Sequence, residues 1–271
     1  MNDPASPGKR GPARFADLGT RLTSAAGMLV LGAVALWFGG WVFEILVVLI
    51  AGAMTWELSR LGAPERPKLA LVIGASTGFA VAAAAGRIGS PDASILLLGP
   101  ALILITPRRD SLLGAAWTGL VSVAAVGLIE ARSVGFLAVL WLVGIVIISD
   151  ASGYFAGRSI GGPKFWPQLS PKKTWSGTVA GWLGATVWSL LLLHFVGAEP
   201  FWLLVALAPV FAMAGQLSDI GESWIKRRAG VKDSSNLIPG HGGLMDRFDA
   251  ISGAAALFMA LEWLHVAQLG G

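Results

Sequence analysis

The chain has 271 residues, of which 55% are hydrophobic and 13% charged, and its formal net charge is +4. Because a soluble domain carries about 25% charged residues, this composition indicates an integral membrane protein. The absence of cysteine excludes disulfides and thiolate metal sites. The modest basic excess is typical of loops that face anionic headgroups or an anionic substrate, and it gives no indication of nucleic-acid binding.

Residues 1–21 are rich in Pro, Gly, Lys and Arg and are predicted to form a disordered cytoplasmic tail. A cleaved signal peptide is the competing interpretation. The first apolar run is long and passes almost directly into a second one, which favours a retained membrane span.

Apolar runs long enough to cross a bilayer as helices, roughly 17–25 residues each, follow the tail. Their apolar residues do not alternate with polar ones, as they would in the strands of a membrane barrel. We therefore expect an all-α, polytopic transmembrane helical bundle of about nine spans. The runs cover residues 22–38, 42–60, 68–86, 93–106, 112–129, 134–155, 176–196, 201–220 and 250–268, and the fourth is short for a span.

The chain divides after the tail into N-terminal transmembrane helices over 22–130 and a C-terminal catalytic transmembrane region over 131–271. Two polar loops interrupt the second region, at 156–175 and 221–249. No soluble domain and no clear internal repeat is evident.

The distribution of basic residues predicts the orientation of the chain. With the N-terminus inside, only Arg87 and Arg132 of the 20 lysines and arginines fall on the outer side. Because cytoplasmic loops carry the excess of Lys and Arg, we expect an N-in, C-out topology. Both polar loops then face the cytoplasm, where nucleotides and magnesium are plentiful.

Carboxylates occur at the inner ends of two predicted spans. Asp150 closes the sixth span and Asp219 lies at the end of the eighth. Ionisable groups at membrane depth are costly, so they usually face a bundle interior or a water-filled cavity. The spacing i, i+3, i+4, i+7 predicts one stripe on a continuing helix, formed by Asp219, Glu222, Ser223 and Lys226.

A second acidic stripe precedes the ninth span, where Asp246 and Asp249 are spaced i, i+3. The two stripes lie at the same membrane face, so Asp246 and Asp249 can meet Asp219 of the first stripe at one site. Magnesium takes one or two carboxylates and completes its shell with water and substrate phosphates. The sequence therefore predicts a magnesium site, and the alternative is that the aspartates only pair with basic residues of the 221–249 loop.

Lys172, Lys173 and Thr174 come just before Gly177, at the expected start of the seventh span. Free backbone N–H groups at a helix start favour anions, which makes this segment a candidate phosphate site. Anchoring to headgroups is the alternative, as it is for the basic residues after the eighth span, Lys226, Arg227, Arg228 and Lys232. The chain lacks a GxxxxGK[ST] motif, which argues against a Walker-type NTPase.

Glycines surround His241 in the second polar loop. Gly240, Gly242 and Gly243 can bring the backbone close to a ligand or allow left-handed conformations. A turn that leads into the ninth span would explain them equally well.

The segment from Ser223 to Asp249 resembles the signature of the phosphatidate cytidylyltransferases, also called CDP-diglyceride synthetases. Two upstream blocks, Asp150 to Arg158 and Ser170 to Gly177, resemble two further blocks of that family. Ser176 stands where a glutamate is expected, so the role of that carboxylate is not carried over. Residues 1–130 resemble the family only in hydropathy.

The resemblance implies nucleotidyl transfer from CTP to phosphatidic acid, which gives CDP-diacylglycerol and pyrophosphate in phospholipid biosynthesis. It implies dependence on magnesium and leaves open a second cation. It also implies a homodimer in the inner (cytoplasmic) membrane, with a polar active site that opens to the cytoplasm and to the lipid.

By the matching positions, catalysis is assigned to Asp219, Lys226, His241, Asp246 and Arg247. Metal binding is assigned to Asp219 and Asp246, with Asp249 and Asp150 as further candidates. Substrate binding is assigned to Lys172, Lys173, Thr174, Ser223, Arg227, Lys232, Asp233, Gly242 and Gly243.

Two alternatives remain open from the sequence. A CTP-dependent kinase of a polyprenol or another lipid alcohol would handle the nucleotide similarly but transfer its γ-phosphate. An ion-coupled transporter would use Asp150 and Asp219 as intramembrane coupling sites. The transporter predicts polar residues near mid-membrane in several spans, whereas here the acids gather at one face.

Overall fold

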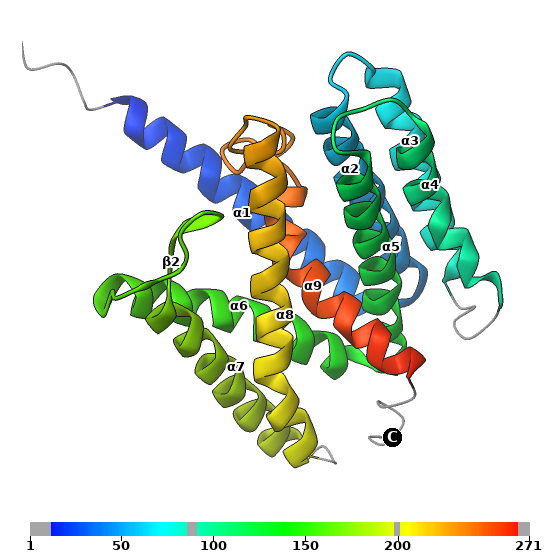
Figure 1. Cartoon of the computed structure of the whole chain (residues 1–271). Coiled ribbons are helices and arrows are strands. Elements are labelled where there is room, and N and C mark those ends of the chain that lie inside the picture. The colour runs from blue at the N-terminus through cyan, green and yellow to red at the C-terminus, as the bar shows by residue number, and fades with distance from the viewer. Residues whose placement is uncertain (1–11, 86–90, 198–200, 265–271) are drawn as a thin grey trace, which may run out of the picture.

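The computed structural model describes residues 12–85, 91–197 and 201–264, and it shows a bundle of helices with a short hairpin (Figure 1). The elements in chain order are α1 (Pro12–Phe38), α2 (Gly40–Gly62), α3 (Pro67–Ala84), the 3-10 helix η1 (Pro91–Leu97), α4 (Leu98–Ile105), α5 (Ser111–Val134), α6 (Phe136–Ser159), β1 (Lys164–Trp166), β2 (Ser170–Thr174), α7 (Trp175–Val196), α8 (Phe201–Arg228) and α9 (Met245–Trp263). Helix α1 begins inside the predicted tail, of which residues 1–11 lie outside the described part.

Among the described residues, seven helices are long and apolar enough to cross a membrane. They are α1 from Gly19, α2, α3, α5, α6, α7 and α8 from Trp202, and they confirm an all-α membrane bundle. The expected fourth span is a shorter apolar segment, Ala93–Ile105, which is divided between η1 and α4. Helix α9 has 19 residues but begins with charged side chains. The count of nine spans and the orientation stay predictions.

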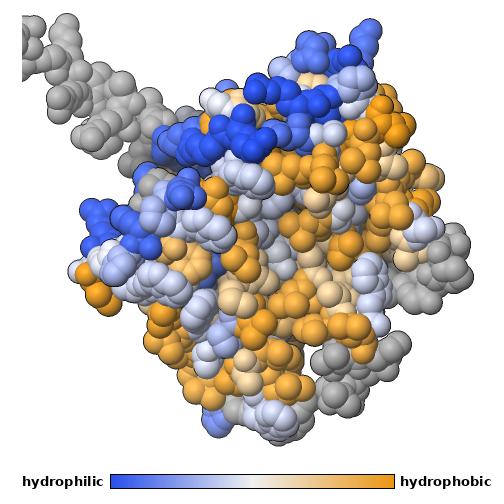
Figure 2. Space-filling model, in the orientation of Figure 1, coloured by the Kyte–Doolittle hydropathy of each residue, from blue (hydrophilic) through white to orange (hydrophobic). Residues whose placement is uncertain are grey.

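The surface is divided between polar and apolar regions (Figure 2). On the face shown, hydrophilic residues gather at the end of the molecule that carries the hairpin and the segment between α8 and α9. The flank below is largely hydrophobic, and side chains such as Leu29, Phe79 and Leu183 are more than 60% exposed. Large contiguous apolar surfaces of this kind suit contact with lipid.

The 156–175 loop contains the two strands of the described residues, which an all-helical expectation does not include. Strand β1 pairs antiparallel with β2 through the register Lys164 with Thr174 and Trp166 with Ser170. Thr174 then caps α7, because its Oγ1 accepts a hydrogen bond from the Gly177 N–H at 3.2 Å. The hairpin and cap place Lys172 and Lys173 directly before α7.

Helix α8 lies at the centre of the bundle, packed between α7 and α9 (Figure 1). Small residues permit this contact. In a membrane the hydrophobic effect does not drive helices together, so their association depends on close packing of the backbones, which small residues allow. A Cβ on Gly253 of α9 would overlap the carbonyl oxygen of Ala214 in α8. A Cβ on Gly215 would lie 3.0 Å from the Ala250 carbonyl oxygen. These contacts bring the ends of α8 and α9 that bear the acids together.

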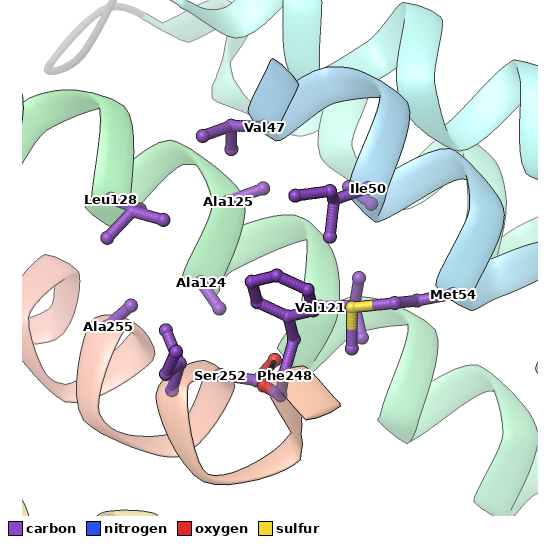
Figure 3. A pocket seen from close by; sticks show the side chains of 12 residues that line it. Val47, Ile50, Met54, Val121, Ala124, Ala125, Leu128, Phe248, Ser252 and Ala255 are labelled. Carbon is purple, nitrogen blue, oxygen red and sulfur yellow. Dashed lines mark hydrogen bonds between the residues drawn. The ribbon is translucent and has the colours of Figure 1, made fainter. Parts of the chain in front are cut away.

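A small apolar cavity of about 40 Å³ lies between α2, α5 and α9 (Figure 3). Its lining includes Val47, Met54, Val121 and Phe248. The volume is only a few times that of a water-sized probe, and polar atoms form a small part of the wall. This cavity is a packing gap in the core and offers no chemistry.

Replacement of Gly253 by Ala is expected to push α9 away from α8. Overpacking of a close contact costs about 1–3 kcal/mol, so Gly253→Ala should lower the thermal unfolding midpoint in detergent. Gly27→Ala on α1 is the matched control, since a Cβ there meets nothing within 4 Å. A Gly253→Ala protein that melts at or above the wild-type temperature would contradict the close α8–α9 contact.

Candidate functional site

A cavity of about 590 Å³ lies where α6, β2, α7, α8 and α9 meet. It brings together seven of the residues that the sequence predicts for the site: Asp150, Lys172, Lys173, Thr174, Asp219, Asp246 and Asp249. Six of them come from the three sequence blocks that carry the family resemblance, and Asp219 lies just before the third, so the fold unites these segments. The volume suits a nucleotide-sized ligand, because small-molecule sites measure about 300–1,000 Å³.

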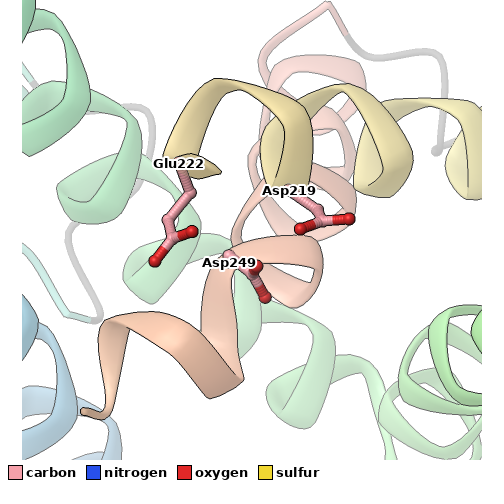
Figure 4. A group of neighbouring side chains, drawn as sticks. All are labelled: Asp219, Glu222 and Asp249. Atoms are coloured by element: carbon pink, nitrogen blue, oxygen red, sulfur yellow. The ribbon is translucent and has the colours of Figure 1, made fainter. Parts of the chain in front are cut away.

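Three carboxylates from two helices lie close to one another (Figure 4), and of these Asp219 and Asp249 line the cavity whereas Glu222 is buried beside it. Asp219 and Glu222 project from α8 and Asp249 from α9, and one oxygen of each lies within 4.8 Å of the others. Hard oxygen ligands at this spacing fit magnesium, which binds carboxylates together with water and phosphate oxygens. The acidic residues of α8 and α9 therefore meet in the fold, as the sequence predicts. Glu222 is an additional candidate ligand, which the sequence analysis placed in the α8 stripe without assigning it to the metal.

Lys226 lies between two buried acids. Its Nζ is 2.6 Å from Glu222 Oε2 and 2.6 Å from Asp246 Oδ1. The Glu222 side chain is fully buried and that of Asp246 is 5% exposed. A buried charge is very costly unless it is paired and hydrogen-bonded, so this ammonium allows both carboxylates to remain near the site. Lys226 does not itself line the cavity.

Asp246 is held on both oxygens. Its Oδ2 accepts hydrogen bonds from the backbone N–H groups of Ser234, at 2.9 Å, and Gly243, at 2.8 Å, and from Ser234 Oγ at 3.0 Å. Burial favours the neutral acid, but the Lys226 ammonium and these N–H groups outweigh it and hold the pKa of Asp246 below its usual value. Asp246 is thus a fixed anion at neutral pH, and its role as a metal ligand stays a prediction.

Lys173 forms an ion pair with Asp219 Oδ2, and its ammonium also reaches the Gln216 carbonyl oxygen at 3.4 Å. Both side chains of the ion pair are partly exposed, so they are accessible from the cavity. Sequence reasoning missed Gln216, whose side chain accepts from Trp182 Nε1 at 3.1 Å and donates to Ser149 Oγ at 3.3 Å. No local pattern marks this glutamine, because its partners lie on other helices.

Tyr154 and Arg158 also line the cavity and were not assigned a role from the sequence, although both stand in the Asp150-to-Arg158 block. The Arg158 guanidinium donates to the Tyr154 hydroxyl at 2.9 Å. Ser176, at the position that departs from the family pattern, donates to the Gly161 carbonyl oxygen at 2.5 Å. A serine there ties the turn between α6 and β1 to the start of α7.

The remaining predicted residues lie outside the cavity lining: Ser223, Arg227, Lys232, Asp233, His241, Gly242, Gly243 and Arg247. Arg247 donates from Nε and Nη2 to the His241 carbonyl oxygen, at 2.9 and 2.5 Å. Gly242 has φ of 83°, and a Cβ there would lie 2.7 Å from Asp246 Oδ2. Gly242, Gly243 and the hydrogen bonds of Arg247 to His241 shape the segment that supports Asp246, and the roles assigned to all eight residues toward substrate stay predictions.

Removal of the Lys226 charge is expected to leave Glu222 and Asp246 as uncompensated buried acids. Breaking a buried pair in this way costs about 3–5 kcal/mol, so Lys226→Met should lower the free energy of unfolding by that amount in a denaturant titration in detergent. The double variant Lys226→Met/Glu222→Gln removes one of the stranded charges and should recover part of the loss. If Lys226→Met is as stable as the wild type, the ammonium does not compensate these acids.

Sequence comparisons agree with the geometry. Residues 19–265 match the model of the cytidylyltransferase family. The phosphatidate cytidylyltransferase of Brucella abortus biovar 1 (strain 9-941) is 33% identical over 254 residues, which cover 90% of this chain and 92% of the relative. The phosphatidate cytidylyltransferase of Staphylococcus saprophyticus is 39% identical over 153 residues, or 54% of this chain and 58% of the relative. The chain therefore belongs to the cytidylyltransferase family.

Proposed function

We propose that this protein transfers the cytidylyl group of CTP to phosphatidate and releases pyrophosphate, as the names of its relatives indicate. The observation that carries the proposal is the cavity that Lys172 and Lys173 line together with the acids of α8 and α9. Cations and carboxylates around one cavity are what a site for a metal-bound polyphosphate needs.

In the proposed reaction, a phosphate oxygen of phosphatidate attacks the α-phosphorus of CTP. The bond between that phosphorus and the bridging oxygen to the β-phosphate breaks, and pyrophosphate leaves with the electron pair. The lipid phosphate is already an anion near neutral pH, so the reaction hardly needs a general base. Its obstacle is the approach of two anions, which positioning and fixed charges overcome.

Asp219 and Asp249 are the proposed holders of a magnesium ion, with Glu222 beside them, and Asp246, the other ligand that the sequence predicts, lines the same cavity. When bound, the ion would neutralise negative charge on the triphosphate and on the departing pyrophosphate. Lys173 is paired with Asp219 and can turn its ammonium to a phosphate that enters the cavity. Lys172 lies next to it at the rim formed by β2.

We further propose that the cavity faces the cytoplasm from the inner membrane. The excess of Lys and Arg in the polar segments supports this orientation, and the hydrophilic end of the molecule carries those segments (Figure 2). A homodimer is implied by the family resemblance alone.

The purified protein in detergent, given CTP, phosphatidate and Mg²⁺, is expected to form CDP-diacylglycerol and pyrophosphate, detected by product mass. A phosphorylated lipid together with CDP would instead identify a CTP-dependent lipid kinase.

Asp246→Asn should abolish turnover, because the amide lacks the negative charge that pairs with Lys226. The variant should still fold, because the amide keeps the shape of the carboxylate.

Asp110→Asn is the matched control for that variant. Asp110 pairs with Arg228 outside the cavity, so its loss should leave the rate near that of the wild type. Near wild-type turnover by Asp246→Asn would refute the role of this residue.

A further inference from the structure

Glu57 is a fully buried carboxylate on α2, in the part of the chain to which the sequence assigns no functional residue. The proposed reaction does not use it, and it does not line the 590 Å³ cavity. A buried carboxylate is strongly unfavourable unless donors surround it. Its position in the fold therefore needs an explanation.

Hydrogen-bond donors from distant residues surround this carboxylate. Oε1 accepts from Ser235 Oγ at 2.6 Å and from the Leu244 N–H at 3.0 Å. Oε2 accepts from the Met245 N–H at 2.7 Å, and Ser234 Oγ, whose single hydrogen is shared with Asp246 Oδ2, lies 3.2 Å from it. These donors lie in the 229–244 loop and at the first residue of α9, so Glu57 ties two parts of the loop to α2.

Two of these donors are backbone N–H groups at the start of α9. The first N–H groups of a helix lack partners within the helix, and an anion there is stabilised further by the helix dipole. In the described residues, Leu244 caps α9 without a side-chain hydrogen bond of its own. Glu57 thus supplies from another helix the acceptor that the local sequence does not provide.

The same contacts reach Asp246. Ser234 Oγ lies between the two carboxylates, 3.2 Å from Glu57 Oε2 and 3.0 Å from Asp246 Oδ2. Asp246 directly follows Met245, whose N–H is bound by Glu57. Gly243, whose N–H also binds Asp246, has no room for a side chain, because a Cβ there would overlap Ser234 Oγ and lie 2.5 Å from Glu57 Oε1.

We propose that Glu57 is a positioning residue, which fixes the 229–244 loop and the first turn of α9 so that Asp246 and Asp249 meet α8 in the reactive arrangement. Helix α1 assists from the same N-terminal half, since Ser24 Oγ donates to the Pro239 carbonyl oxygen at 2.9 Å. The N-terminal helices thereby act on the site without touching the cavity. This inference rests on the proposed function for its kinetic readout only.

The kinetic test compares Glu57→Gln with Glu44→Gln. Both glutamates lie on α2, about 20 Å apart along the helix, and Glu44 is partly exposed and far from the loop. The amide of Glu57→Gln brings its own donors toward groups that already donate. Changes to groups that orient ligands typically cost about 10- to 100-fold, so Glu57→Gln should lower kcat by that factor with a smaller change in KM for CTP, whereas Glu44→Gln should match the wild type.

A second readout follows the loop directly. The chain contains no cysteine, so a spin label on Leu237→Cys, at a side chain that is 48% exposed, reports on the 229–244 loop alone. Glu57→Gln should make the label more mobile in electron paramagnetic resonance spectra, and Glu44→Gln should not. This measurement needs no turnover, so it tests Glu57 even if the wild-type protein forms no CDP-diacylglycerol and the proposed function fails.

The proposal is overturned if Glu57→Gln folds and shows either the wild-type kcat or the wild-type mobility of the label. A residue that only stabilises the fold would change neither kcat nor the label mobility of the folded protein. If Glu57→Gln does not fold, Ser235→Ala decides. That variant removes one donor to Glu57 and leaves the hydrogen bonds of Asp246 in place. Because Ser235 Oγ also accepts the Leu237 N–H at 3.0 Å, only kcat is compared for this variant. It should lower kcat several-fold, and a wild-type kcat would overturn the proposal.

Discussion

The structure depends on gathering several carboxyl groups at the ends of two apolar helices. Asp219 and Glu222 on α8 and Asp246 and Asp249 on α9 lie close together, partly or fully out of water. Such a cluster would repel itself and resist burial, so the fold has to compensate it. Lys226 does so between Glu222 and Asp246, and Lys173 does so at Asp219.

The close contact of α8 and α9 is the second half of this arrangement. Glycines at 215 and 253 let the two backbones approach until each meets carbonyl oxygens of the other helix. The acids therefore project from helices rather than from loops, which suits a site that stabilises charge through fixed positions. The hairpin brings Lys172 and Lys173 to the same cavity, where Lys173 pairs with Asp219, and Thr174 fixes the point at which the strand becomes helix.

Sequence patterns predicted most of the helices and much of the site, because apolar runs and i, i+3, i+4 spacing are local. The Asp219 stripe and the Asp246 pair were expected to converge, and the structure brings them together. The hairpin was missed, since its strands are short and contain or border prolines. The start of α9 at Met245, five residues before the expected span, was missed because its N-terminal acceptor is Glu57 on α2. A single glutamate in an apolar run does not reveal that a distant loop covers it. The role of Gln216 is equally unpredictable from its local sequence, because its partners lie on other helices.

We propose that the acids of α8 and α9 form one divalent-metal site, and Mn²⁺ binding tests this most directly. Mn²⁺ prefers the same oxygen ligands as Mg²⁺ and is detected by electron paramagnetic resonance without nucleotide or turnover. We expect saturable binding by the wild-type protein, weakened about tenfold or more in Asp249→Asn and unchanged in Asp110→Asn. Equal Mn²⁺ affinity in the wild type and in both Asp219→Asn and Asp249→Asn would contradict it.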